Sequence, residues 1–548
     1  MAMVTIMGLT NQSVTKSQHL IRLLSSILLL SGSFAYADIE VKPKITASSY
    51  AYWYQAKQES SGTDRGLAFM LTPSITINRD SSNMKTSLFW QEEMLWYHDA
   101  QRSQQSGQTY NINNVVNAFN QRVSWGLRAA RGYQVRDSKQ GVFADIVTNS
   151  ENLATTKNYG TNVNFTTLRG AATKANLSLS YDIYNVEGTT LGIDDSYSND
   201  NYRGAVNLGS ASRSGLFFWH LDGNYNLTER ESYDNFESAR ANALIGVPLF
   251  GPVSAIARGV YERNDGSNDF LNEFRAYGAG VEVKLGKVSW VNVTWNRSSL
   301  SNEAVDTATL EIEDDEYLAM ELFLAPSRRT SLSMSVDKRY FGRSMTLQGQ
   351  YNLRFISIRL SASDTVRTQS QLDAEFEDLG IFVCPNGSTD LSDCFRPPTQ
   401  HYIPGAGESY QQVSQYNPEL NEFITLSRNV SLNIGYSKNK LSLNANASTG
   451  EDEYVETQRL NRRHTLSIQG TWRLYSDLSA NAEASFYRLD YTNDDRIDDN
   501  LLASLGLTYA LSKKVELKLD GRHIRRDSSL ANADISETRL GISMSYEF

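Results

Sequence analysis

The sequence predicts an all-β protein, a transmembrane antiparallel up-and-down β-barrel. Three observations predict this fold class: an export signal at the N-terminus, strands in which apolar and polar residues alternate, and connections that alternate between short and long. Counting strands between those connections gives about 24, with a range of roughly 22 to 26, because a tilted membrane strand uses ~9 to 11 residues. The 548-residue chain is long enough for such a barrel and its loops.

The first 37 residues have the pattern of a secretory signal peptide. Sparse positive charge precedes an apolar run at residues 23–30, and small residues follow, ending in Ala-Tyr-Ala at residue 37. This order of charge, apolar core and A-x-A site is typical of a signal peptide that is removed after export. We therefore expect a signal peptide at 1–37 and the barrel at 38–548.

The last strand shows the alternation most clearly. Small or charged residues occupy every second position, so the strand has one apolar face. That face consists of Leu540, Ile542, Met544, Tyr546 and Phe548. Ending on Phe548, with Tyr546 on the same face, resembles the C-terminal signal that bacterial barrel-assembly machinery reads. That machinery is therefore an expected partner.

A hairpin near the C-terminus indicates which face of the strands meets water. Val515, Leu517 and Leu519 lie on one face of its second strand. The opposite face is a ladder of alternating charge that consists of Glu516, Lys518, Asp520 and Arg522. Such a ladder suits a water-filled lumen, with the apolar face toward lipid. We expect these charged side chains to line the lumen.

Residues 85–99 fit the alternation poorly, because Glu92 and Glu93 are adjacent. Successive side chains on a strand point to opposite faces, so one of the two carboxylates falls on the apolar side. The sequence leaves three explanations open: a carboxylate that faces the apolar side, a position beyond the bilayer, or a β-bulge.

The connections alternate in length along the whole chain. Short turns fall near 81–84, 251 and 287, and longer polar connections lie between such turns, for example near 135–157. Outer-membrane barrels have short periplasmic turns and long extracellular loops, so both termini are expected on the periplasmic side and the strand number is even. A soluble β-sandwich also has alternating strands. The export signal, the low count of 10 prolines and this rhythm favour a barrel in a Gram-negative outer membrane.

One polar segment, at about 367–420, is much longer than a connection needs to be, and loops of this length tend to be functional or disordered. It contains the only cysteines, Cys384 and Cys394, which we expect to form a local disulfide in an oxidising compartment. An open barrel of ~24 strands would leak, and strand-like sequence begins almost at Asp38, without a separate N-terminal plug domain. We therefore expect the segment to fold over or into the pore mouth.

No catalytic motif is present: the histidines are scattered, and no G-x-S-x-G, H-E-x-x-H or phosphate-binding glycine loop occurs. We expect no enzyme activity and no cofactor. The acidic clusters in the outer loops favour a solvated loop surface over a metal site, because no calcium-loop spacing is present. The cysteine pair is a poor zinc site, since structural zinc takes four Cys or His ligands. No nucleic-acid partner is expected.

The central hairpins carry a short motif. Arg339-Tyr340-Phe341-Gly342 is followed by two strands and by a Ser-Ala-Ser-Asp-Thr turn into the long loop. This stretch of sequence resembles the PEP-CTERM-system-associated outer-membrane protein family, whose members look like large barrels and are encoded with exopolysaccharide gene clusters. The family has no catalytic residues to carry over to this chain.

The resemblance implies an outer-membrane channel or accessory barrel in exopolysaccharide export or assembly. It implies polysaccharide and periplasmic export proteins as partners, besides outer-membrane lipid and lipopolysaccharide. Arg354 and Arg359, together with Lys518 and Arg522, are then expected to line the path of an acidic or neutral glycan.

Two other functions stay open from the sequence. A passive porin for small solutes or oligosaccharides predicts a constriction loop and open conductance. A structural or surface-receptor barrel would use its acidic loops to contact other cells, matrix or phage. A high-affinity siderophore transporter is disfavoured by the missing plug.

Overall fold

The structure is a computed structural model. It describes residues 38–56, 64–98, 104–143, 145–147, 150–167, 170–187, 189–190, 193–194, 196–213, 215–231, 233–266, 271–303, 311–368, 381–385, 408–412, 423–455 and 457–548. The predicted signal peptide at 1–37 lies outside these residues. So do Cys394 and the side chain of Cys384, and the disulfide therefore stays a prediction.

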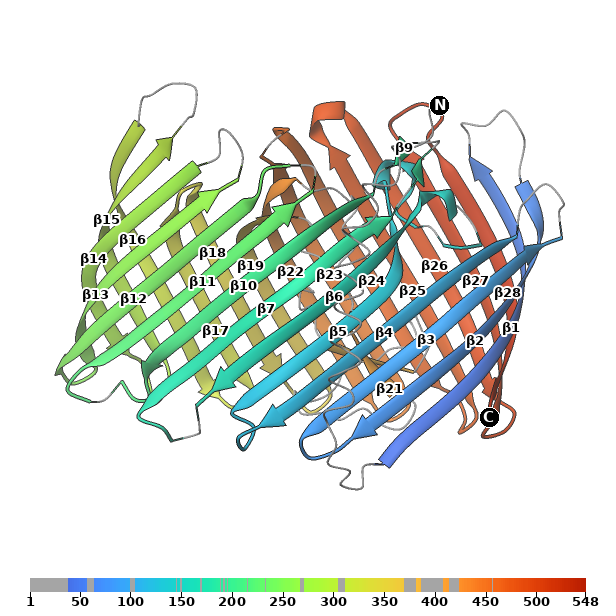
Figure 1. Cartoon of the computed structure of the whole chain (residues 1–548), viewed down its shortest axis with the longest axis horizontal. Coiled ribbons are helices and arrows are strands. Elements are labelled where there is room, and N and C mark those ends of the chain that lie inside the picture. Colours follow the sequence, from blue (N-terminus) through green and yellow to red (C-terminus); the bar gives the residue numbers. More distant parts are fainter. Residues whose placement is uncertain are drawn as a thin grey trace, which may run out of the picture.

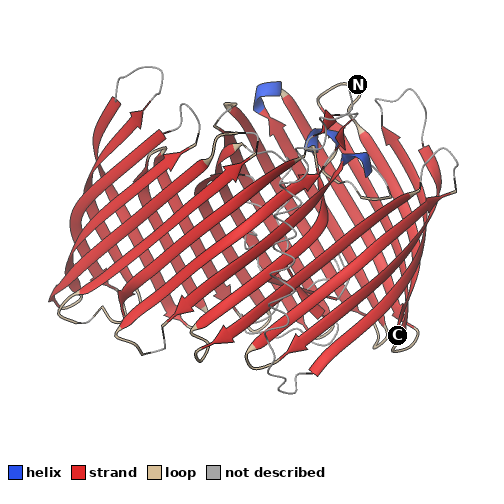
Figure 2. Cartoon of the chain, in the orientation of Figure 1, coloured by secondary structure: helices blue, strands red, loops and turns tan. Residues whose placement is uncertain are grey.

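One closed antiparallel sheet of 24 strands forms the molecule, which confirms the predicted fold class and strand number (Figures 1 and 2). Neighbours in the barrel sheet follow the chain order, and β1 (Asp38–Ala56) pairs with β28 (Ile535–Glu547), so the ring has no open edge. Closure pairs the backbone groups within the wall, which lipid requires because it offers no hydrogen bonds. Among the described residues, no helix is long and apolar enough to cross a membrane.

The strands that follow β1 in the first half of the barrel are β2 (Asp64–Asp80), β3 (Met84–Tyr97), β4 (Gln105–Ala118), β5 (Val123–Val135), β6 (Leu153–Thr166), β7 (Thr173–Glu187), β10 (Tyr197–Ser210), β11 (Phe218–Arg230), β12 (Phe236–Phe250), β13 (Val253–Asp265), β14 (Leu271–Lys284) and β15 (Trp290–Glu303). Those of the second half, before β28, are β16 (Glu311–Ser327), β17 (Thr330–Arg339), β18 (Gly342–Asn352), β19 (Ile356–Thr368), β22 (Ile424–Lys438), β23 (Leu441–Tyr454), β24 (Arg459–Arg473), β25 (Leu478–Tyr491), β26 (Arg496–Ala510) and β27 (Val515–Ser528).

A few short elements lie outside the barrel sheet. They are the paired strands β8 (Thr189–Thr190) and β9 (Ile193–Asp194), the paired strands β20 (Ile381–Pro385) and β21 (Glu408–Gln412), and the 3₁₀ turns η1 (Ser138–Gln140), η2 (Ser150–Asn152) and η4 (Thr492–Asp494). The pair β20 and β21 belongs to the long segment predicted at 367–420. The placement of that segment at the pore mouth stays a prediction, because most of it lies outside the described residues.

The outer face of the barrel carries the apolar residues of the alternating strands. On β26, Leu501 and Leu505 point outward, and Leu505 is 69 % exposed, whereas Asp498 and Asn500 point inward and are buried. Exposed apolar side chains on the outside of a barrel face lipid. The turn between β26 and β27 lies at the same end as Phe548, and the longer connections lie at the opposite end (Figure 1). That opposite end is therefore extracellular.

The wall turns from the front to the back of the barrel at β13 to β16, which we call the narrow end because ion pairs join its two sides (Figure 1), and β14 carries glycines on its inner face. A Cβ on Gly280 would lie 1.9 Å from the carbonyl oxygen of Val293. One on Gly278 would lie 2.2 Å from the side-chain oxygen of Asn296. Both distances are far inside van der Waals contact, so only glycine fits at these positions.

Candidate functional site

The inner wall from β22 to β25 carries uncharged hydrogen-bonding side chains over most of its height. On β22, Ser431 and Asn433 are buried on the inner face, while Val430 and Ile434 face outward. Paired residues on neighbouring strands form rows across the wall, which we call rungs. The upper rung contains Ser431, Ser448 and Thr465, and the next contains Asn433, Asn446, Ser467 and Ser485. A third rung contains Asn444 and Gln469. Ser361 on β19 continues the upper rung, with its hydroxyl 2.6 Å from that of Ser431. Glu483 and Arg359 are the charged exceptions within these rungs.

Amide side chains on the inner wall lie flat over glycines of the neighbouring strand. A Cβ on Gly506 would be 2.3 Å from the side-chain oxygen of Asn481, its paired residue. The pair Gly126 and Asn162 on the other side of the ring repeats this arrangement at 2.2 Å. Because these amides lie against the wall, they project little into the lumen. The carbonyl oxygens of Asn444 and Asn446 have no hydrogen-bond partner within the described chain and are themselves shielded from solvent.

At the narrow end, ion pairs cross the lumen. Arg258 on β13 donates to both carboxylate oxygens of Asp337 on β17, one of them at 3.2 Å. Arg339 on β17 pairs with Glu262 on β13 in the same manner, with its Nε 3.0 Å from Oε2. Three strands separate β13 from β17 in the sheet, which is ~19 Å along the wall at ~4.8 Å a strand. The side chains therefore meet through the interior, and this lobe of the barrel is filled.

The tip of the β17–β18 hairpin explains how the contact forms. The ladder between β16 and β17 ends at Met320 and Val336, so the tip beyond them is released from β16 and leans inward. Tyr340 packs against a buried apolar cluster that includes Val260 and Phe274. Gly342 closes the turn with φ 104°, a left-handed conformation that favours glycine. The motif on which the family resemblance rests thus forms the inward tip.

A third contact closes the periplasmic side of the same lobe. Arg213, in the turn between β10 and β11, pairs with the buried Glu282 on β14. Its guanidinium lies 3.9 Å from the ring centre of Trp290, and its backbone carbonyl accepts a hydrogen bond from Lys284 at 2.7 Å. This turn therefore folds under the lobe and is held by charge pairing and cation–π contact.

At the other end of the ring, the connection between β5 and β6 folds across the lumen. We call the described residues of this connection, 136–143, 145–147 and 150–152, the crossing segment. Asp145 in this segment accepts a 2.7 Å hydrogen bond from Arg522 on β27 and another of 2.7 Å from Arg539 on β28. The hydroxyl of Tyr97 on β3 donates to the carbonyl of Val147 at 2.8 Å. The segment thus joins the wall at β3 to the wall at β27 and β28.

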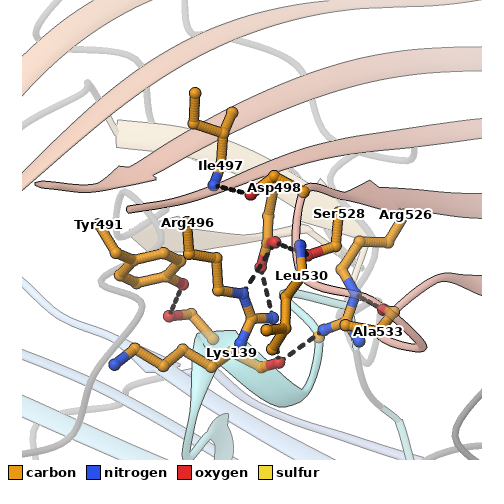
Figure 3. Close-up of polar contacts among 12 residues, drawn as sticks. Lys139, Tyr491, Arg496, Ile497, Asp498, Arg526, Ser528, Leu530 and Ala533 are labelled. Carbon is orange, nitrogen blue, oxygen red and sulfur yellow. Dashed lines mark hydrogen bonds and ion pairs between the residues drawn. The ribbon is translucent and has the colours of Figure 1, made fainter. Parts of the chain in front are cut away.

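A second anchor of the crossing segment lies at η1 (Figure 3). The backbone carbonyl of Lys139 accepts hydrogen bonds from Arg496 at 2.7 Å and from Arg526 at 2.8 Å. Its ammonium lies 2.5 Å from Asp494. The hydroxyl of Ser138 is 2.5 Å from that of Tyr491. Arginines on adjacent strands therefore hold the backbone of the segment against the extracellular rim of β25 to β27.

The internal geometry of the crossing segment is set by its own polar residues. Asp137 caps η1 by accepting a hydrogen bond from the backbone of Lys139 at 2.8 Å. The buried Asn152 donates to the carbonyls of Asp137 and Gly141, both at 2.9 Å. Gly141 has φ 132°, which favours glycine. These bonds satisfy the backbone of a turn that has left the sheet.

One contact of the crossing segment depends on pH. The Lys139 ammonium donates to Asp494 in the outer turn η4 and holds the pKa of that carboxyl below its usual range. A carboxyl whose folded pKa is lowered stabilises the folded contact above its ordinary pKa, about 3.9. This contribution is lost as pH falls through the lower folded pKa. The anchor is therefore complete at neutral pH and weakens in strong acid.

The residues predicted from sequence fall at several places. Glu516, Lys518 and Asp520 alternate with the outward Leu519 on β27, so they lie on the inner face with Arg522. Arg359 also lies on the inner face, opposite the buried Asn433.

Other predicted residues lie off the inner wall. Arg354 is not on the wall but in the exposed periplasmic turn, because β18 ends at Asn352 and β19 begins at Ile356. Tyr546 and Phe548 point outward, with ring centres 4.9 Å apart.

Sequence reasoning missed the crossing segment and the cross-lumen pairs. The length of the connection near 135–157 was the available signal, but its partners on β25 and β27 lie more than 350 residues away. Within the described ranges, no three His, Cys, Asp or Glu side chains are grouped to hold a metal ion.

Comparison with protein families matches residues 462–548, from β24 to β28, to the family described as "Putative beta-barrel porin 2". A comparison with curated proteins found no match. The porin-family match and the lipid-facing apolar belt place the chain in the outer membrane as a barrel of general porin-like type.

Several solved outer-membrane structures are similar in outline. The siderophore receptor PirA from Acinetobacter baumannii is 9 % identical, with 93 % of this chain and 81 % of that chain covered and a TM-score of 0.43. The FrpB iron transporter from Neisseria meningitidis is 8 % identical, with 95 % and 83 % covered and a TM-score of 0.41. OccK1 (OpdK) from Pseudomonas aeruginosa is 8 % identical, with 93 % and 99 % covered and a TM-score of 0.32.

Proposed function

We propose that this barrel is an outer-membrane conduit for exopolysaccharide export, without catalytic activity of its own. The observation that carries the proposal is the uncharged amide and hydroxyl wall of β22 to β25. Asn, Gln, Ser and Thr side chains each offer hydrogen-bond donors and acceptors. A glycan chain presents hydroxyls of both kinds, so such a wall binds it weakly at many points and lets it slide.

The charge distribution supports a neutral cargo over an ionic one. Lumen-facing arginines are paired with carboxylates at both ends of the ring, as in Arg258 with Asp337 and Arg522 with Asp145. Paired charges produce little field at a distance, whereas a lining of one sign would select ions by steering. Apart from Arg359 and Glu483, the middle of the wall is thus a hydrogen-bonding surface, not a charged filter.

A passive porin is the second candidate, and the porin-family match at 462–548 favours it. The crossing segment separates the two candidates. An inward loop held at both Lys139 and Asp145 suits a conduit that is closed at rest and opened by its cargo or by a periplasmic export partner. A passive porin needs only a constriction.

The export proposal is tested by deleting the gene in its own bacterium and measuring where the bacterium's polysaccharide accumulates. We expect surface polysaccharide to fall severalfold and periplasmic polysaccharide to rise, with recovery when the gene is restored. The restored copy with Arg525 changed to alanine serves as a control, because Arg525 faces outward and, within the described residues, forms an ion pair only with Asp527. Unchanged surface polysaccharide, with slower uptake of small sugars, would instead identify a passive porin.

A further inference from the structure

A carboxylate lies among the apolar residues on the outward face of β3, opposite the polar Gln108 of β4. The outward positions of this strand are Leu88, Trp90, Glu92, Met94 and Trp96, so Glu92 has apolar residues above and below it. The neighbouring outward residues of β2, Leu71 and Ile75, are also apolar. Of the explanations left open by the sequence, the structure therefore selects a carboxylate on the apolar face.

The strand pairing excludes a bulge at this position. The pairs of Leu71 with Met94 and of Ser74 with Gln91 keep one register, and only the ladder opposite Pro73 is interrupted. Glu93 turns into the lumen, where Gln91 donates to it at 3.1 Å. Glu92 makes no hydrogen bond or ion pair with any residue of the described chain.

An ionisable side chain on the lipid face is costly, by ~2 to 4 kcal/mol for Arg or Lys at the midplane and somewhat less for Asp or Glu. Such a residue is usually paired, or faces protein or water. Glu92 has neither arrangement within its own barrel. A partner from another molecule is therefore the simplest physical explanation.

The same outer face also carries an incompletely paired guanidinium. Arg131 on β5 faces outward between its paired residues, Tyr110 of β4 and Lys157 of β6, and Lys157 is itself ion-paired with Glu187. One of its nitrogens donates to Gln108 at 3.0 Å, while its Nε is shielded from solvent and has no hydrogen-bond partner in the described ranges. Gln108 is in turn the residue paired with Glu92. The acid and the base thus flank one glutamine.

Glu92 and Arg131 lie at nearly the same depth in the membrane. Because the strands are tilted, the position on β5 that is in line with Glu92 lies ~6 Å closer to the extracellular end than Glu92. Arg131 is two residues closer to the periplasm than that position, which is a displacement of ~5 Å in the opposite direction. Figure 1 shows this tilt on the front wall, where β3, β4 and β5 rise together toward the extracellular end. A two-fold axis along the membrane normal, passing near Gln108, would bring each Glu92 against Arg131 of a second copy.

We infer that the outer face of β3 to β5 is a dimer interface, in which Glu92 of each copy pairs with Arg131 of the other. A two-fold interface uses one self-complementary patch, and this patch holds an acid and a base on either side of its centre. Trp90, Met94 and Tyr110 supply the aromatic and apolar surface that interface centres favour. The carboxylate is then desolvated against a partner charge instead of lipid.

The test is a charge exchange, read as the mass of the purified barrel in detergent by native mass spectrometry. The wild type is expected to run as a dimer. Glu92→Arg and Arg131→Glu are each expected to reduce the dimer fraction at least ~10-fold, since like charges meet in the interface and cost more than 1.4 kcal/mol. The double variant Glu92→Arg/Arg131→Glu restores opposite charges and is expected to recover the dimer.

Arg462→Glu is the matched control, because Arg462 also faces outward but lies on β24, on another part of the ring. It is expected to leave the dimer intact. Heat-dependent migration on gels verifies that each variant is a folded barrel. A wild-type mass of one chain would overturn the inference. The inference would also be overturned if each single variant dissociated and the folded double variant stayed monomeric. Equal dissociation of the Arg462→Glu control would overturn it as well.

Discussion

A barrel in which residues 137–151 are replaced by a short Gly-Ser turn is expected to conduct about tenfold or more current than the wild type, because barrels of ~16 to 18 strands already leave an aqueous channel. Val135 and Leu153 are directly paired, so a hairpin turn can join β5 to β6 without strain. The replacement removes Lys139 and Asp145, and with them both anchors across the lumen. Single-channel recording in planar bilayers measures the effect.

A point variant at one anchor tests the effect of detaching the crossing segment without deleting it. Arg522→Ala removes one of the two arginines that hold Asp145, and we expect brief openings of the full size. Arg525→Ala on the same strand removes an ion pair with the outward Asp527, away from Asp145, and is expected to behave as the wild type. A shortened barrel that is as closed as the wild type would show that the crossing segment is not the barrier.

The second large effect is on stability. Replacing Asp337 by leucine is expected to lower the free energy of unfolding by ~3 to 5 kcal/mol, because it leaves a buried guanidinium unpaired. The side chains of Arg258 and Asp337 are only 4 % and 5 % exposed, and Arg240 approaches the same carboxylate at 3.6 Å. Urea unfolding in lipid vesicles, followed by tryptophan fluorescence, measures the change.

A paired substitution shows whether the cost arises from the orphaned charge. Arg258→Met combined with Asp337→Leu removes both members, and is expected to recover much of the lost stability. Asp527→Leu is the exposed control, since Asp527 and Arg525 are 56 % and 60 % exposed, and is expected to cost less than ~1 kcal/mol. A loss at Asp337 no larger than at Asp527 would contradict a buried cross-lumen pair.

The sequence predicts the wall of the barrel well, because the wall is built from local rules. Alternation assigns Leu519 to the outside and Lys518 to the inside of β27 from neighbours alone. The rhythm of short and long connections then yields the strand number and the periplasmic end. Each of these features involves residues close together in the chain, so each leaves a pattern that a single sequence displays.

The contents of the lumen do not follow such rules. Asp145 contacts Arg522, 377 residues away in the chain, and Arg339 contacts Glu262, 77 residues away. The sequence around each residue does not indicate its partner. The segment at 367–420 attracts attention by its length, whereas the segment that the structure shows inside the lumen is much shorter. In the crossing segment, Asp137 and Asn152 form the hydrogen bonds that fix the turn. In the sequence they cannot be distinguished from ordinary cap and turn residues.

The motif Arg339-Tyr340-Phe341-Gly342 illustrates the same division. The sequence locates it, and its resemblance to a family of exopolysaccharide-associated barrels stays a prediction. Only the structure shows that it forms a hairpin tip that leaves the wall at Val336 and reaches the opposite strand. The motif fills the lobe between β13 and β17 with ion pairs and with the packing of Tyr340.

The most direct test of the glycan conduit is the block of current through the shortened barrel by added oligosaccharides. Neutral glucose oligomers are expected to interrupt the current, and oligomers of a uronic acid to do so at least ~10-fold less strongly at equal concentration, a difference of 1.4 kcal/mol. Asn444→Leu/Asn446→Leu, which removes two amide side chains from the inner rungs, is expected to shorten the neutral block severalfold. Equal block by both glycans, or none by the neutral one, would contradict the account.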